Sequence, residues 1–291
     1  VDLFVVPARG TVVDGRAKQF DGIPVQLNVV THASLEEYAR TFDAYRVTPS
    51  DRSQLYTVHM QAGLKAVTRL AFGRPLHASP VCEAAYSRID QDVLRQLVMT
   101  ECARQVARNA EDAAGAMAVG DPLIALSATA AALHYACETI LAAHGDVYLG
   151  DSFFWRRLAR LDPEAELART VWHALPENLP WGADSAAVRR RAEDGLHLAS
   201  HLASHALLDG WTRRLVGVPP YAPQVEGARR NPFFTLLRFG DTITFAGPDK
   251  AFRTTEQTAR LWLDDARPAA ATRKFIDLEL LLPAEREVEG R

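Results

Sequence analysis

The 291-residue chain has few cysteines, and those it has follow no metal-ligand spacing such as CxxC. The three cysteines are Cys82, Cys102 and Cys137. A sparse and odd number of cysteines is typical of a reducing compartment, where thiols pack in the core more often than they react. The sequence therefore argues against a disulfide scaffold and predicts a cytoplasmic protein.

The chain also lacks an excess of charge of one sign, because 33 Lys and Arg stand against 36 Asp and Glu, a net charge of −3. No overall basic field attracts nucleic acid, so we expect no nucleic-acid partner. The most apolar window, residues 123–143, contains His134 and Glu138 and offers no uninterrupted run of about 18 apolar residues. We therefore expect no membrane span, and the first residues lack the pattern of a signal peptide.

Three common catalytic or nucleotide-binding motifs are missing as well, namely the GxxxxGK[ST] loop, the GxGxxG fingerprint and the GxSxG elbow. Their absence argues against a standard P-loop enzyme, a fingerprinted dinucleotide binder and a Ser/His/Asp hydrolase of the elbow type.

The pattern that is present changes along the chain. Residues 3–6 and 23–30 are predicted strands, and Ser34 with Glu37 predicts a capping box at the start of a helix. Residues 53–216 are predicted to be nearly all helical, with one long helix over 87–117. Asp121 and Asp184 are expected to cap two more helices, the first over 123–143 and the second running to about residue 216.

After a proline-rich stretch at 219–223, residues 235–246 predict a β-hairpin and residues 255–263 a short helix. The sequence thus predicts an α+β fold that is mostly α, with a short mixed sheet, a helical bundle and a small C-terminal hairpin and helix module. The expected domains are residues 1–52, 53–218 and 224–282.

Asp2 leads a predicted buried strand, and phosphoryl-transfer enzymes place carboxylates at such positions to hold Mg²⁺. The alternative for a single Asp is a solvated strand end. The segment 153–158 sets aromatic rings beside Arg156 and Arg157. Such a segment can stack a base and pair a phosphate, or it can form an ordinary core face with solvated arginines.

A stripe of polar residues at four-residue spacing follows one face of a predicted helix. Its members are Glu193, His197, His201, His205 and Asp209. Histidines at i and i+4 can chelate a transition metal, so His197, His201 and His205 form a weaker metal-site hypothesis. One helix rarely supplies three ligands to one ion, and the alternative is a face of solvated or hydrogen-bonded imidazoles.

The order of these elements, together with several short segments, resembles the polymerase-beta-like nucleotidyltransferase superfamily, on the side of the kanamycin nucleotidyltransferases. The resemblance covers about residues 1–175. The segments that carry it are Asp2-Leu3-Phe4-Val5-Val6, Gly120-Asp121-Pro122, the stretches 131–138 and 142–148, and Trp155-Arg156-Arg157-Leu158.

The resemblance implies transfer of a nucleoside monophosphate from a nucleoside triphosphate to a hydroxyl of a small molecule of the antibiotic or natural-product type, with Mg²⁺. Asp2 matches the second carboxylate of the family's Asp-x-Asp pair. Arg156 or Arg157 would steer phosphate. A general base can come from the helical domain, for which Glu101, Glu111 and Asp112 are candidates, and we assign the catalytic role to Glu101.

The chain departs from the family pattern in three places. The Gly-Ser turn and the first Asp would lie before residue 1, Gln26 stands where a third carboxylate is expected, and Ser152 and Phe153 replace a lysine. The chain is therefore interpreted as an N-terminally short member or a degenerate one. A degenerate member would be a binding or scaffold protein, and a homodimer stays open in either case.

Overall fold

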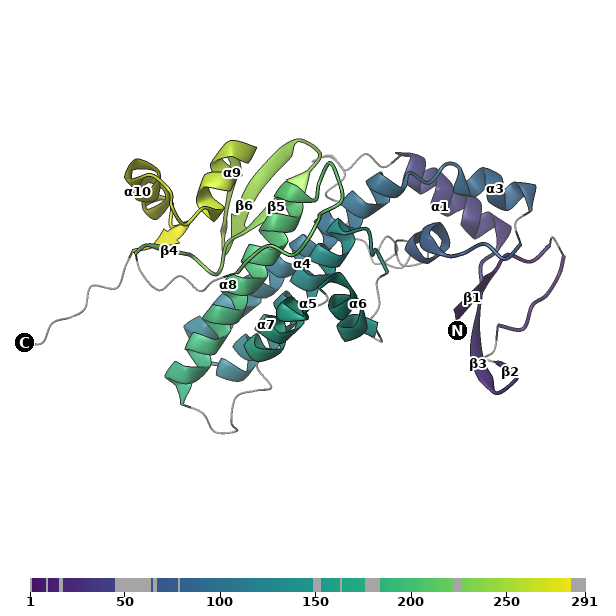
Figure 1. Cartoon of the computed structure of the whole chain (residues 1–291), viewed down its shortest axis with the longest axis horizontal. Coiled ribbons are helices and arrows are strands. Elements are labelled where there is room, and N and C mark those ends of the chain that lie inside the picture. Colours follow the sequence, from purple (N-terminus) through teal and green to yellow (C-terminus); the bar gives the residue numbers. More distant parts are fainter. Residues whose placement is uncertain are drawn as a thin grey trace, which may run out of the picture. The chain divides into compact units, whose positions relative to one another are not determined.

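The structure is a computed structural model, and it describes residues 2–8, 10–15, 18–44, 64, 67–77, 79–148, 153–162, 164–175, 184–221 and 227–283. Its fold is α+β and mostly α, with small sheets and a helical bundle, as the sequence predicts (Figure 1). Contacts divide the chain into two compact units, Val1–Leu94 and Arg95–Arg291. The three domains expected from the sequence stay a prediction.

The first unit contains a three-stranded sheet in the order β1-β3-β2, in which β1 (Asp2–Val5) is parallel to β3 (Ile23–Val29) and β2 (Lys18–Phe20) is antiparallel to it. Helices α1 (His32–Ala44) and α3 (Pro80–Tyr86) contact each other, and residues 67–72 are also helical. One apolar core joins these elements, and Phe4 and Val6 of the first strand region pack against it. Its buried members are Val30, Leu35, Ala39, Leu70, Cys82 and Ala85.

Two predicted helix starts are wrong, and in both cases another side chain caps the helix. The first helix begins at His32, and the backbone N–H of Ser34 donates to Thr31 Oγ1 at 3.1 Å, so Thr31 provides the cap. The long helix expected from residue 87 begins at Gln91, because Asp90 accepts hydrogen bonds from two backbone N–H groups of its first turn.

The second unit is built around most of α4 (Gln91–Val119), from Arg95 on, and four further helices: α5 (Pro122–Ala143), α6 (Phe154–Leu161), α7 (Glu166–Ala174) and α8 (Ser185–Asp209). The expected caps are confirmed, since Asp121 accepts from Ile124 N at 3.1 Å and Asp184 from Ala187 N at 2.7 Å. The last helix ends at Asp209 rather than near residue 216. The guanidinium of Arg95 donates to the carbonyls of Gly210 and Trp211, which satisfies the chain just after the helix end.

The C-terminal part of the second unit packs a sheet and the helix over Glu256–Leu263 on α8 (Figure 1). The expected hairpin is confirmed as β5 (Thr235–Phe239) and β6 (Thr242–Gly247), and the expected helix as α9 (Glu256–Leu263). The sequence analysis missed β7 (Lys250–Thr254), α10 (Ala269–Asp277) and the pair of β4 (Arg229–Arg230) with β8 (Leu281–Leu282).

Helix α5 is the one described helix that is long and apolar enough to cross a membrane. More than half of its most apolar window, 56%, is buried inside the protein, as in the core helix of a globular domain. Its small side chains let α8 approach closely. At Gly195 of α8, an added Cβ would lie 2.5 Å from Thr129 Cγ2 and 3.4 Å from Leu133 Cδ1.

We expect Gly195→Ala to lower the free energy of unfolding by about 1–3 kcal/mol, because Thr129 is fully buried and cannot move away. Gly115→Ala on α4 is the matched control, since its added Cβ meets nothing within 4 Å beyond the adjacent residues and backbone of its own helix. There the better helix propensity of alanine should raise stability by up to about 1 kcal/mol. Urea denaturation of both variants checks the pair, and equal shifts in the same direction would contradict the packing argument.

Candidate functional site

Asp2 begins β1, and the parallel register with β3 pairs it with Gln26. The register continues through Phe4, which pairs with Asn28. Of the eight positions that this register joins, only Asp2 carries a carboxylate. The structure thus brings Asp2 and Gln26 to one level of the sheet. Both a carboxylate and an amide carbonyl are oxygen ligands of the kind Mg²⁺ accepts, but the amide adds no negative charge.

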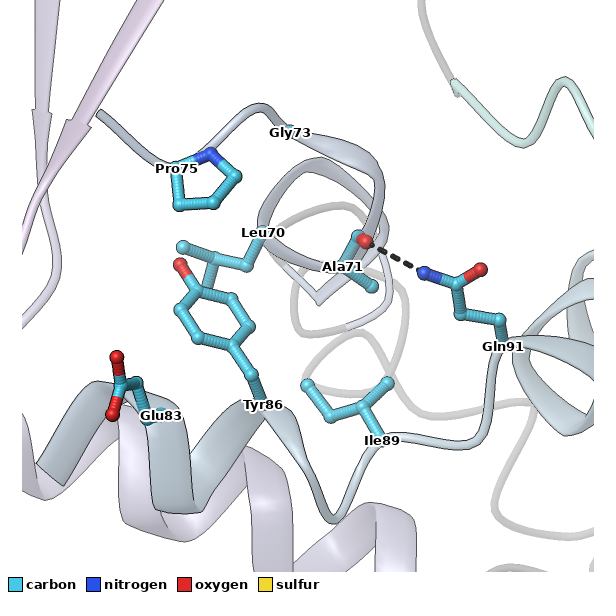
Figure 2. Close-up of a pocket in the computed structure, with 8 residues that line it drawn as sticks. All are labelled: Leu70, Ala71, Gly73, Pro75, Glu83, Tyr86, Ile89 and Gln91. Carbon is cyan, nitrogen blue, oxygen red and sulfur yellow. Dashed lines mark hydrogen bonds between the residues drawn. The ribbon is translucent and has the colours of Figure 1, made fainter. Parts of the chain in front are cut away.

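The first unit also contains a cavity of about 360 Å³ that the sequence analysis missed (Figure 2). Its walls are mostly apolar, and the side chains of Glu83, Tyr86 and Gln91 supply its polar groups. The residues that line it are Leu70, Ala71, Gly73, Pro75, Glu83, Tyr86, Ile89 and Gln91. They come from a helical segment, a loop and two helix ends, so no local motif in the sequence indicates them.

Two polar side chains of this cavity are described by their surroundings: Gln91 is hydrogen-bonded, and Tyr86 is partly buried. The Gln91 amide donates to the carbonyl of Ala71 at 3.1 Å, which ties the start of α4 to the opposite wall (Figure 2). Burial, followed by the nearby Cys82, raises the pKa of Tyr86, so its hydroxyl stays protonated at neutral pH. A cavity of this size, apolar with a few polar groups, suits a small organic molecule.

In the second unit, Glu101 is part of a buried charge network on α4. It is 8% exposed and accepts hydrogen bonds from Arg104 at 2.9 and 2.6 Å and from Gln105 at 2.9 Å. The other base candidates, Glu111 and Asp112, are exposed on the same helix. Both of its oxygens are engaged in hydrogen bonds within the packed helix, and this favours a structural role for Glu101.

Arg157 of α6 belongs to the same region of the second unit. Its guanidinium is 2% exposed and donates to Glu138 at 2.8 Å and to Asp146 at 3.1 Å. The charges of Glu138, Glu101, Arg157 and Arg104 all act on the buried thiol of Cys102, whose pKa is raised mainly by its burial. The structure therefore brings together Glu101 and Arg157, which the sequence analysis selected for different reasons, and adds Glu138 and Asp146, which it did not select.

Arg156 differs from its neighbour because its side chain is exposed and its guanidinium lies 5.8 Å from the centre of the Phe153 ring. Near it, Trp155 and Trp172 meet edge to face with their ring centres 5.3 Å apart, and both are partly exposed. Of the two predicted phosphate-binding arginines, Arg156 is thus the one open to solvent.

We expect Arg157→Ala to lower the free energy of unfolding by about 3–5 kcal/mol, because it leaves Glu138 buried without its cation. Arg156→Ala, one residue away and exposed, is the control and should change stability by at most about 0.5 kcal/mol. Thermal or urea unfolding measures both. A mild effect of Arg157→Ala would mean that its pairs with Glu138 and Asp146 do not hold α5 and α6 together.

The histidine stripe lies on α8, and its three rings bind three different groups. His197 Nδ1 lies 3.2 Å from Tyr221 Oη, His201 Nε2 donates to Pro220 O at 2.9 Å, and His205 Nδ1 lies 3.1 Å from Asp209 Oδ2. In the described part of the chain, no three His, Cys, Asp or Glu side chains come together as a metal site. The metal hypothesis for His197, His201 and His205 therefore gains no geometric support.

Burial is the main cause that lowers the pKa of His197 and of His201 to about 3, and the charge of Arg230 adds to it at both. Each ring is neutral in the folded protein and takes a proton on unfolding below pH 6.5, its ordinary pKa. Their contribution to stability is therefore complete above pH 6.5 and is lost progressively as the pH falls toward 3.

Between pH 6 and 4, each such histidine adds up to about 1.4 kcal/mol per pH unit to the slope of unfolding free energy against pH. We expect His201→Gln to reduce this slope by about that amount, and urea denaturation at several pH values measures it. His173→Gln, which replaces an exposed histidine, is the control. The explanation fails if His201→Gln and the unchanged chain show equal slopes.

Comparison of the chain with protein-family models, with curated proteins and with solved structures finds no match. The case for a function therefore depends on the residues themselves. The resemblance to nucleotidyltransferases stays a prediction. The structural features that bear on it are the β1–β3 register and the cavity in the first unit.

Proposed function

We propose that this protein is a magnesium-dependent nucleotidyltransferase that moves a nucleoside monophosphate from a nucleoside triphosphate to a hydroxyl of a small molecule. The observation that carries the proposal is the β1–β3 register, which sets Asp2 beside Gln26. Adjacent parallel strands offer oxygen ligands at one level, the arrangement that a phosphate-bound Mg²⁺ needs. The cavity of about 360 Å³ in the same unit supports a small acceptor.

In such a reaction the acceptor oxygen attacks the α-phosphorus, the bond to the pyrophosphate oxygen breaks, and the hydroxyl proton leaves to a base or to water. Bound Mg²⁺ supplies charge neutralisation for the phosphates. Asp2 and Gln26 are the residues we assign to hold it. Of the two phosphate-steering arginines that the resemblance implies, both in the second unit, Arg157 is engaged in buried pairs and Arg156 is exposed. The triphosphate and Mg²⁺ are both available in the cytoplasm, where we place the protein.

Gln26 favours a second candidate function, that of a nucleotidyltransferase-fold protein that binds a ligand without transferring anything. A neutral amide beside Asp2 halves the charge that two carboxylates would supply, and two Mg²⁺ ions repel each other unless several carboxylates neutralise them. A protein of this type would bind a nucleotide or a small molecule and release no pyrophosphate.

We expect Asp2→Asn to weaken magnesium-dependent binding of ATP, GTP, CTP or UTP by at least about tenfold, since loss of even an indirect metal partner costs that much. Gln26→Glu should tighten the same binding by adding the missing charge. The control is Asp21→Asn, which removes one carboxylate from the exposed turn before β3. Calorimetric titration of each triphosphate, with Mg²⁺ and with EDTA, measures the effect.

A pyrophosphate-release assay with kanamycin and other polyhydroxylated amines as acceptors then separates the two candidates. Release that requires Mg²⁺ and is lost in Asp2→Asn supports transfer. Binding without release supports the second candidate. If no triphosphate binds, or if Asp2→Asn and Asp21→Asn behave alike, the assignment of Asp2 to a magnesium site is wrong.

A further inference from the structure

A second, smaller cavity of about 40 Å³ lies in the second unit between α8 and β4. The residues that line it are Glu193, Asp194, His197, Tyr221, Arg229, Arg230 and Pro232. A water needs about 10–15 Å³ of such space, so the cavity has room for a group of a few heavy atoms. We call it the Arg230 pocket.

Arg230 is 3% exposed, and its hydrogen-bond partners are neutral. Its Nε donates to His197 Nε2 at 3.4 Å and its Nη1 to Leu263 O at 3.2 Å. Among the described residues, no carboxylate forms an ion pair with its guanidinium. Its Nη2 makes no hydrogen bond to them either, and this atom is not among the fully buried polar atoms that lack a partner. Burying a cation is costly unless an anion compensates it, so this arrangement is unusual.

The bonds around His197 leave a second free donor in the same pocket. Because Arg230 Nε donates to His197 Nε2, and because burial keeps this ring neutral, the ring proton lies on Nδ1. Nδ1 then donates to Tyr221 Oη, 3.2 Å away. The hydroxyl hydrogen of Tyr221 is left without an acceptor among the described residues. Burial, with the charge of Asp194, raises the pKa of Tyr221 to about 12, which keeps this hydrogen in place.

The two carboxylates of the pocket are countered by cations other than Arg230. Glu193 accepts from Arg229 at 3.4 Å, and the charges of Arg191, Arg229 and Arg190 act on Asp194. A third carboxylate, Asp265, also acts on Arg230, but its direct ion pair is with Arg267 at 3.5 Å. The free hydrogens on Nη2 of Arg230 and on Tyr221 therefore remain for a ligand. A guanidinium beside a hydroxyl donor is the chemistry that recognises an oxyanion.

We propose that the Arg230 pocket binds a small oxyanion, the carboxylate or the phosphate group of a ligand, through Arg230 Nη2 and the hydroxyl of Tyr221. The bound anion supplies the charge that the buried guanidinium lacks and ties β4 and Tyr221 to α8. The site lies in the second unit and does not depend on the nucleotidyl-transfer reaction proposed for Asp2.

The test is calorimetry and thermal unfolding of the full chain with acetate, inorganic phosphate or chloride at constant ionic strength. We expect saturable binding and a raised Tm with acetate or phosphate. Tyr221→Phe should weaken binding by about tenfold or more, because it removes a hydrogen bond to a charged group. Arg230→Lys should weaken it similarly, since a single ammonium cannot keep the bonds to His197 and Leu263 and also donate from the position of Nη2. Tyr38→Phe, in the first unit, is the matched control and should bind like the unchanged chain.

Binding of acetate alone identifies a carboxylate ligand and binding of phosphate alone a phosphate ligand, and either supports the site. A chloride effect as large as the others, or full binding by Tyr221→Phe, overturns the proposal by showing an adventitious ion only. Tyr221→Phe decides the matter even if Arg230→Lys does not fold, because it leaves the buried guanidinium and the aromatic ring in place.

Discussion

The close approach of α5 and α8 is the contact on which the second unit depends. It is possible because Gly195 faces Thr129 and Leu133, where no larger residue fits. With one face held by α5, α8 presents another to the C-terminal sheet, to which Ser200 and Ser204 bond through Phe234 O and Leu236 N. Its third face carries the histidines. A single helix therefore joins the bundle, the sheet and the Arg230 pocket, and a change in its position would alter all three.

Two buried arginines show how burial and pairing together separate a structural charge from one available for binding. Arg157 is 2% exposed and Arg230 is 3% exposed, so both side chains are removed from water to the same extent. Arg157 meets two carboxylates, Glu138 and Asp146, and nothing is left for a ligand. Arg230 meets an imidazole and a carbonyl, and among the described residues no carboxylate pairs with it directly, although the charge of Asp265 acts on it. The sequence analysis had selected Arg157 as a ligand contact, because sequence spacing says nothing about which carboxylates a folded chain will place beside an arginine.

Local signals predicted what depends on neighbouring residues. Asp121 and Asp184 cap helices as expected, and the hairpin over 235–246 follows from alternating residues around Gly240-Asp241. The prediction failed where distant residues decide the outcome. The end of α8 depends on Arg95, more than a hundred residues earlier. The Arg230 pocket joins residues from 193 to 232, and the cavity of Figure 2 joins residues from 70 to 91, without a motif in either case.

The candidate site in the first unit shows the same division. Asp2 and Gln26 were each selected from the sequence, but only the parallel register makes them neighbours. Because the two residues are neighbours, the function of the site depends on the total negative charge that they supply. Triphosphate and Mg²⁺ together need negative ligands from the protein to fix the metal against the phosphates. At this level of the sheet, Asp2 supplies one charge and Gln26 supplies a dipole. In our proposal this pair holds one metal ion with its nucleotide, whereas transfer needs a second metal position, so the charge at residue 26 separates the two candidate functions.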